Sequence, residues 1–125
     1  MARVLVAAQT PPGAFPSLPV TPGSRALSEQ AADTSLGNYT TIVSGKTLVL
    51  AHNTDLGAHT VTFTSVVDGQ NRSGDITAYS IAAGVTALFG PFVTTPVGWS
   101  QASPAGSLWM DANDPTIKWI VITQA

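Results

Sequence analysis

At 125 residues the chain is long enough for one domain, and the lack of cysteine excludes disulfides, thiolate zinc sites and cysteine nucleophiles. Only 10% of the residues are charged, well below the roughly 25% usual for soluble proteins, which leaves much neutral surface for contacts between subunits. The net charge of −2 and the scattered Lys and Arg residues argue against nucleic-acid binding. The sequence contains no run of about 18 apolar residues, so we expect no membrane span.

The first part of the chain has the composition of an extended arm. Arg3–Ala8 is rich in β-branched residues and predicts a short strand that docks on the domain or on a neighbour. Gln9–Gly23 contains five prolines, which favour a polyproline-like conformation. Ser24–Ala32 has a helix-compatible composition but is too short for a stable helix alone. We therefore divide the chain into an extended N-terminal arm, residues 1–36, and a β-domain, residues 37–125.

The β-domain is a series of short strands separated by glycine turns. The turn Ser44–Gly45 joins two apolar runs and predicts a hairpin, and period-two alternation from His59 to Val67 predicts a half-buried strand. The expected strands are Tyr39–Val43, Lys46–His52, His59–Val67, Asp75–Ile81, Val85–Phe89, Ser107–Asp111 and Ile117–Thr123. With no long helix, this pattern predicts an all-β fold, a small β-sandwich, jelly roll or β-barrel-like domain.

The last strand differs from the others because Ile117–Thr123 is apolar on both of its faces. A strand of this kind is usually sheltered on both sides. We expect the core to cover one face, and a partner or the arm to cover the other.

Polar clusters in two turns could in principle hold a metal ion. His52 and His59 could face each other across a hairpin with Asp55 between them, which is the ligand set of a two-histidine, one-carboxylate site. Asp111, Asn113 and Asp114 could offer oxygens to calcium. The spacing matches no metal signature, and Asp and Asn are common in turns for their own hydrogen bonds. We predict no metal, no cofactor and no catalytic residue, and His59 is expected at the rim of the core.

Three tryptophans, Trp99, Trp109 and Trp119, offer an alternative function. Exposed indoles on a β-sandwich can stack on sugar rings, so a carbohydrate-binding module for host adsorption is the rival hypothesis. The preferred interpretation is a shared aromatic core with the phenylalanines, because aromatic rings dominate core burial.

Several stretches resemble the head decoration, or capsid cement, proteins of tailed bacteriophages. They are Met1–Val6 with the proline segment that follows, Asn53–Thr54, Thr60–Val66, Arg72–Tyr79 and Phe89–Phe92. The resemblance implies a β-domain on the outer surface of the capsid, often clustered as trimers, with an extended terminal arm that reaches adjoining subunits. Families of this kind carry no catalytic residues. Tail and head-closure proteins of virions use similar small β-domains.

The sequence therefore predicts a non-enzymatic structural protein of the virion that stabilises the expanded phage capsid through many contacts. The expected partners are the major capsid protein and neighbouring copies of the chain, as a homotrimer, with no nucleic acid and no membrane. The residues expected to contact the capsid or other subunits belong to the arm: Arg3, Val4, Leu5, Val6, Phe15, Leu18 and Val20.

Overall fold

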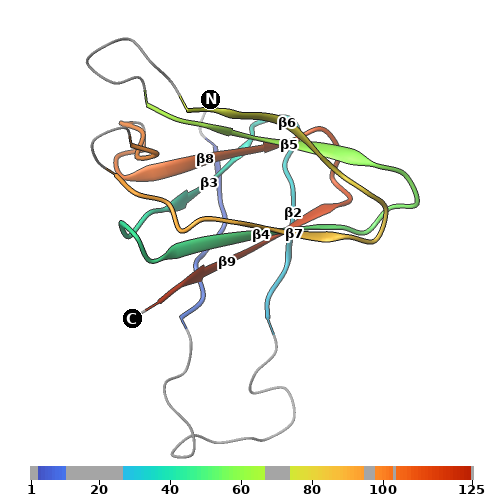
Figure 1. The fold of residues 1–125 in the computed structure, drawn as a ribbon, viewed down its shortest axis with the longest axis horizontal. Coiled ribbons are helices and arrows are strands. Elements are labelled where there is room, and N and C mark those ends of the chain that lie inside the picture. Colours follow the sequence, from blue (N-terminus) through green and yellow to red (C-terminus); the bar gives the residue numbers. More distant parts are fainter. Residues whose placement is uncertain (1–2, 11–26, 67–73, 95–97, 103, 125) are drawn as a thin grey trace, which may run out of the picture.

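The computed structural model describes residues 3–10, 27–66, 74–94, 98–102 and 104–124. These residues form two stacked sheets (Figure 1). The five-stranded sheet, here sheet A, has the order β1-β3-β8-β5-β6, and the four-stranded sheet B has the order β2-β9-β4-β7. Sheet A contains β1 (Val4–Leu5), β3 (Asn38–Thr41), β8 (Ser107–Ala112), β5 (His59–Thr64) and β6 (Ile76–Ile81). Sheet B contains β2 (Gln30–Ala31), β9 (Ile117–Thr123), β4 (Thr47–Asn53) and β7 (Thr86–Phe89).

The predicted all-β class is confirmed, and the described residues contain no helix. Two sheets with separate edges make this a small β-sandwich and not a closed barrel. All strand pairs are antiparallel except β1 with β3. The described part of the chain therefore has no helix that is long and apolar enough to cross a membrane.

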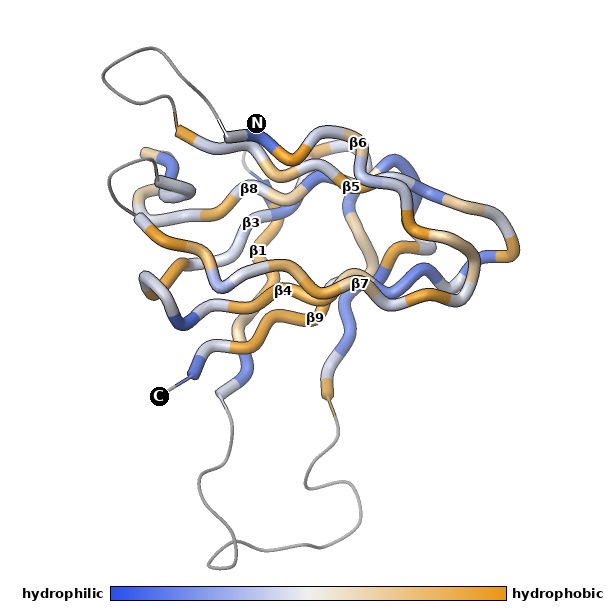
Figure 2. Tube along the Cα trace, in the orientation of Figure 1, coloured by the Kyte–Doolittle hydropathy of each residue, from blue (hydrophilic) through white to orange (hydrophobic). Residues whose placement is uncertain are grey.

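The core lies between the sheets and is centred on aromatic rings. The ring of Phe63 lies 4.7 Å from that of Phe89, 5.5 Å from that of Phe92 and 5.9 Å from that of Trp119, measured between centroids. Because alternate residues of a strand point to opposite faces, Val61, Phe63 and the following Ser65 are all buried, as the sequence pattern predicts. Figure 2 shows the hydrophobic residues running along β4, β7 and β9 of sheet B.

The predicted hairpin between residues 39–43 and 46–52 is wrong, because its two strands lie in different sheets. β3 pairs with β1 and β8 in sheet A, whereas β4 pairs with β7 and β9 in sheet B. The Ser44–Gly45 turn does form, with the Lys46 amide donating to the Val43 carbonyl at 2.9 Å. It carries the chain from sheet A to sheet B, where β4 pairs with β9 along its full length.

Two described pieces of residues 1–36 are strands of the sandwich. Val4–Leu5 (β1) is an edge strand of sheet A, and Gln30–Ala31 (β2) is an edge strand of sheet B. The helix-compatible stretch from Ser24 to Ala32 has no helix among its described residues. The first strand was expected to dock either on its own domain or on a neighbour. In the structure β1 pairs with β3 of its own domain.

Candidate functional site

The first four predicted contact residues, Arg3 to Val6, follow β3 of their own chain. The Val4 amide donates to the Gly37 carbonyl at 3.0 Å, and the Val6 amide donates to the Tyr39 carbonyl at 2.8 Å. Val6 is buried in the core, whereas Leu5 is 47% exposed. Of the four residues Arg3 to Val6, Leu5 is the one whose side chain is exposed. The other predicted contacts, Phe15, Leu18 and Val20, lie outside the described residues.

Arg3 fixes the start of β1 to the outer side of sheet A. Its guanidinium donates to both carboxylate oxygens of Asp111, with Nη1–Oδ1 2.9 Å and Nη2–Oδ2 3.2 Å, and Nη1 also donates to the Asn38 carbonyl. The guanidinium carbon lies 4.4 Å from the ring centroid of Trp109, a cation–π distance. Gly37 makes room for this group, because a Cβ there would lie 2.5 Å from the Arg3 Nη1.

A buried asparagine joins this strand to the opposite sheet. Asn38 is fully buried in β3, where its amide nitrogen donates to the Val4 carbonyl at 3.2 Å. Its side-chain oxygen accepts from the Asp33 amide at 2.8 Å and from the Trp119 indole at 3.1 Å. One side chain therefore connects β1, the approach to β3 and β9.

Hydrogen bonds between Gln9 and Ser28 hold the two ends of the proline-rich segment together. The Gln9 side chain donates to the Ser28 carbonyl at 2.8 Å and accepts from the Ser28 amide at 2.9 Å. The Gln9 backbone also pairs with β9, through Val121 at 2.8 Å and Thr123 at 2.9 Å. The segment between Gln9 and Ser28 therefore begins and ends at one place, beside β9 at the edge of sheet B.

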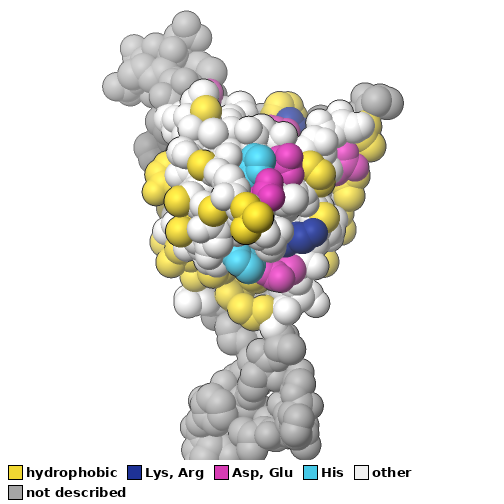
Figure 3. Space-filling model, turned by 90° about the vertical axis from the view of Figure 1, so that its right-hand side faces the viewer, with side chains coloured by type: hydrophobic (Ala, Val, Ile, Leu, Met, Phe, Trp, Pro, Cys, Tyr) yellow, Lys and Arg dark blue, Asp and Glu magenta, His cyan; other side chains and the backbone are white. Residues whose placement is uncertain are grey.

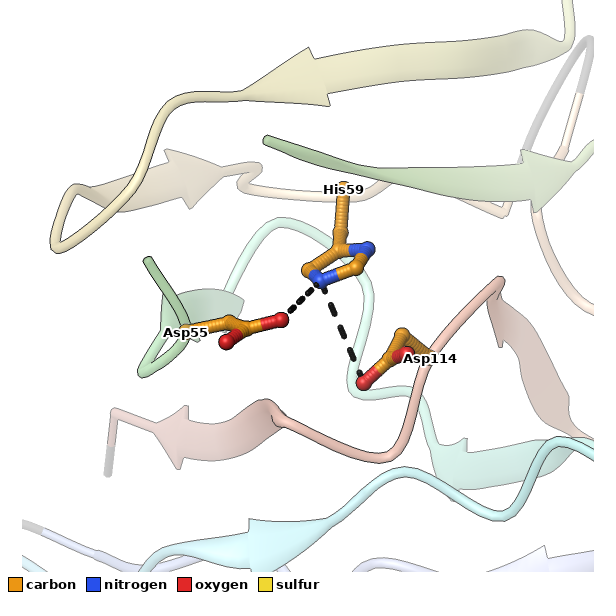
Figure 4. Close-up of side chains that lie close together, drawn as sticks. All are labelled: Asp55, His59 and Asp114. Carbon is orange, nitrogen blue, oxygen red and sulfur yellow. Dashed lines mark hydrogen bonds and ion pairs between the residues drawn. The ribbon is translucent and has the colours of Figure 1, made fainter. Parts of the chain in front are cut away.

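One histidine lies between two carboxylates that come from different turns (Figure 4). The Nε2 atom of His59 is 2.7 Å from Asp55 Oδ2 and 4.0 Å from Asp114 Oδ1. One ligand atom from each of the three side chains lies within 4.8 Å of the others, so together they could hold a divalent cation. In the structure the cluster joins the turn after β4 to the turn before β9.

The hydrogen bonds of this cluster set the charge state of its carboxylates. The His59 ring and then the Leu56 amide lower the pKa of Asp55 below its usual 3.8. The hydroxyl and then the amide of Thr116 lower the pKa of Asp114 in the same way. Hydrogen bonds to the ionised form favour that form, so both carboxylates stay charged at neutral pH.

The two histidines do not face each other, so the possible grouping of His52 and His59 around Asp55 does not form. His52 Nδ1 lies 2.9 Å from a carboxylate oxygen of Glu29 instead. The residues meet different partners because His52 belongs to sheet B and His59 to sheet A, where it is half-buried at the start of β5. Each histidine has acidic side chains beside it on the same face of the molecule (Figure 3). Of the Asp111, Asn113 and Asp114 group, Asp111 pairs with Arg3, and the Asn113 side chain accepts from the Thr60 amide.

The tryptophans divide between the core and the surface. Trp119 is fully buried, and Trp99 is half-buried with its ring 5.2 Å from that of Phe92, in edge contact with the core. Trp109 differs from the prediction of a shared core. It alternates with the buried Leu108 and Met110 along β8, so its side chain lies on the outer face of sheet A under Arg3. The ten-residue spacing carried no information on this, since strand register decides which side each ring takes.

Sequence reasoning missed the residues that fasten the arm: Gln9, Ser28, Asn38 and Asp111. Their hydrogen bonds join positions 19 to 108 residues apart, except for the bond from the Asp33 amide to Asn38, so spacing along the chain gives almost no signal for them. Comparison of the chain with protein-family models, with curated proteins and with solved structures finds no match.

Proposed function

We propose that the chain is a non-enzymatic structural protein of a virion, located on the outer surface of the capsid, where it decorates and stabilises the expanded phage head. The observation that carries the proposal is the paired hydrogen bonding of Gln9 and Ser28 at the edge of sheet B. A sandwich that holds both ends of a proline-rich segment at one point is suited to present that segment to a surface outside the domain. The segment contains the apolar residues Phe15, Leu18 and Val20, which are the side chains proposed to contact the capsid.

The mechanism is multivalent binding. Ordering a peptide segment on a surface opposes binding, and proline reduces this entropic cost because it restricts the free chain. Copies joined as a homotrimer would bind their second and third sites intramolecularly, at high effective concentration. The partners in this proposal are the major capsid protein and neighbouring copies of the chain.

The experiment is co-sedimentation of the full chain with empty phage heads, expanded and unexpanded. A variant in which residues 11–26 are replaced by a Gly/Ser segment of equal length is run beside it. This replacement keeps Gln9 and Ser28, whereas removal of residues 1–36 would also remove β1 and β2 from the two sheets. We expect saturable binding to expanded heads that weakens at least tenfold in the variant. Absence of binding to either head form would overturn the proposal.

The rival function, carbohydrate binding, is favoured by one observation, the position of Trp109 on the outer face of sheet A. Because Arg3 lies over this indole, a sugar ring could stack there only by displacing the guanidinium. Iodide quenching of tryptophan fluorescence measures the accessibility of the ring, and the Arg3→Ala variant should increase it. Saturable binding to a glycan array that Trp109→Ala removes would support this function over capsid binding.

A further inference from the structure

Three side chains that can bind a metal ion meet where two turns cross between the sheets. Asp55 lies in the turn from β4 in sheet B to β5 in sheet A, and His59 is the first residue of β5. Asp114 lies in the turn from β8 in sheet A back to β9 in sheet B. We call these three residues the His59 cluster (Figure 4). An ion bound by all three would link the two crossings of the chain.

The two turns are held together by hydrogen bonds that do not involve the cluster itself. Thr54 donates to the Thr116 carbonyl through its amide at 3.1 Å and through its hydroxyl at 2.6 Å. The Asn113 amide donates to the Thr60 carbonyl at 3.1 Å, and the Thr60 amide donates to the Asn113 side chain at 3.0 Å. The backbone positions of the three side chains are therefore set before any ion binds, which is what a preorganised site requires.

The His59 cluster contains more negative charge than its one imidazole can balance. Their hydrogen bonds lower the pKa of both Asp55 and Asp114, so the two carboxylates carry two negative charges at neutral pH. The Nε2 atom of His59 holds at most one proton, and it lies 2.7 Å from Asp55 but 4.0 Å from Asp114. Even a protonated ring leaves one negative charge unbalanced. A divalent cation would balance both carboxylates and accept the neutral ring nitrogen as a ligand.

The spacing of the three ligand atoms suits a small ion after minor side-chain movement. Bonds of about 2.0–2.2 Å to Zn²⁺ place tetrahedral ligands about 3.3–3.6 Å apart. The distance from His59 Nε2 to Asp55 Oδ2 would therefore lengthen, and the distance to Asp114 Oδ1 would shorten, each by less than about 1 Å. The Asp55 and Asp114 side chains are 42% and 33% exposed, which leaves them room for this change. Three protein ligands leave a fourth position for water.

The donor atoms indicate the class of ion. An imidazole nitrogen suits Zn²⁺ and the neighbouring first-row metals, whereas Ca²⁺ and Mg²⁺ take oxygen ligands. We propose that Asp55, His59 and Asp114 form a binding site for a first-row divalent metal ion, with Zn²⁺ as the ion to test. An ion that binds the folded chain alone would also stabilise it by mass action. This inference goes beyond the proposed function and does not depend on binding to phage heads.

The test is isothermal titration of Zn²⁺ into the full chain without an affinity tag, after dialysis against EDTA and then metal-free buffer. We expect saturation at one ion per chain with a Kd below about 100 μM, and Ca²⁺ binding at least tenfold weaker. Asp114→Asn keeps the size of the side chain and removes its charge, so Zn²⁺ binding should weaken at least tenfold. The thermal midpoint of the wild type should rise with Zn²⁺ concentration.

The second histidine provides a matched control. His52 also has a carboxylate beside it, that of Glu29 at 2.9 Å, but its printed ion pairs include no second acidic group. Glu29→Gln should therefore leave Zn²⁺ binding unchanged. An equal loss of binding in Glu29→Gln and Asp114→Asn would show adsorption to exposed histidine and carboxylate groups, and would overturn the inference.

Nuclear magnetic resonance of the imidazole nitrogens locates the ion on the wild-type chain, so this result does not depend on the folding of Asp114→Asn. The chain has two histidines, and the spectrum of His52→Gln assigns their signals. Zn²⁺ should shift the Nε2 signal of His59 and leave the ring signals of His52 in place.

Three results would overturn the inference. They are the absence of saturable Zn²⁺ binding up to about 1 mM, binding that Asp114→Asn leaves unchanged while circular dichroism shows it folded, and a shift of the His52 signals alone. The His59 cluster would then be a hydrogen-bonded junction between the two turns and not a metal site.

Discussion

The Asn38 network offers the sharpest test of how the arm is held, because one buried amide serves three separate elements. Replacement of Asn38 by Leu keeps a similar volume and removes all of its hydrogen-bonding atoms. The Trp119 indole, the Asp33 amide and the Val4 carbonyl each lose a partner. A buried polar group left unpaired costs about 1–3 kcal/mol, so we expect Asn38→Leu to lower the free energy of unfolding by about 3–6 kcal/mol. That is a large part of the roughly 5–15 kcal/mol typical of a domain.

The assay is urea unfolding followed by far-UV circular dichroism. Asn113→Ala is the control, because the Asn113 side chain accepts one hydrogen bond in an exposed turn and its loss should cost below about 1.5 kcal/mol. Trp119→Phe removes the indole donor alone. In the double variant with Asn38→Leu, the two effects should fall short of additivity by about 0.5–3 kcal/mol, since both remove the same bond. Full additivity, or a loss below about 1 kcal/mol for Asn38→Leu, would refute the reasoning.

Three further predictions concern the arm and the charged cluster. Gly37→Ala should lower the free energy of unfolding by about 1–3 kcal/mol because of its φ of +78°, and by more because the new Cβ displaces Arg3. Gly45→Ala, at φ +73° with nothing near its Cβ, should show the backbone cost only, and urea unfolding compares the two variants. Arg3→Ala should lower the free energy of unfolding by about 1.5–3 kcal/mol, and a loss equal to that of Arg3→Lys would contradict a role for the paired hydrogen bonds. Because the pKa of Asp55 is lowered in the folded state, its ionised carboxylate stabilises the fold fully above pH 3.8, and this stability is lost as the pH falls through the folded pKa. Asp55→Asn should therefore show a shallower decrease of the thermal midpoint below about pH 4 than the wild type. An unchanged slope would count against the His59 contact.

The parts of the fold that the sequence predicted are those that depend on neighbours in the chain. Alternation in β5 placed Val61 and Phe63 in the core, and the two-sided pattern of residues 117–123 matches β9 to the residue. Ile120, on the side of β9 opposite Trp119 and Val121, is buried as well. These predictions needed only the period of a strand, which is a local property.

The parts that could not be predicted depend on which strands pair. The turn at Gly45 joins strands of two sheets and not a hairpin, so His52 and His59 separate and each finds its own acidic partner. Trp109 points outward because β8 places Leu108 and Met110 inward. No local sequence pattern predicts which strands pair, and period-two alternation alone does not determine which side of a strand faces the core.

The anchoring of the arm changes what its function requires. An arm with no contacts to its own domain would become ordered only on its target, and the entropy lost on ordering it would oppose binding. Instead, β1 and β2 complete the two sheets, and Gln9 fixes Ser28 beside β9. The chain between these points has its ends fixed before any partner arrives, which reduces the entropy left to lose on binding.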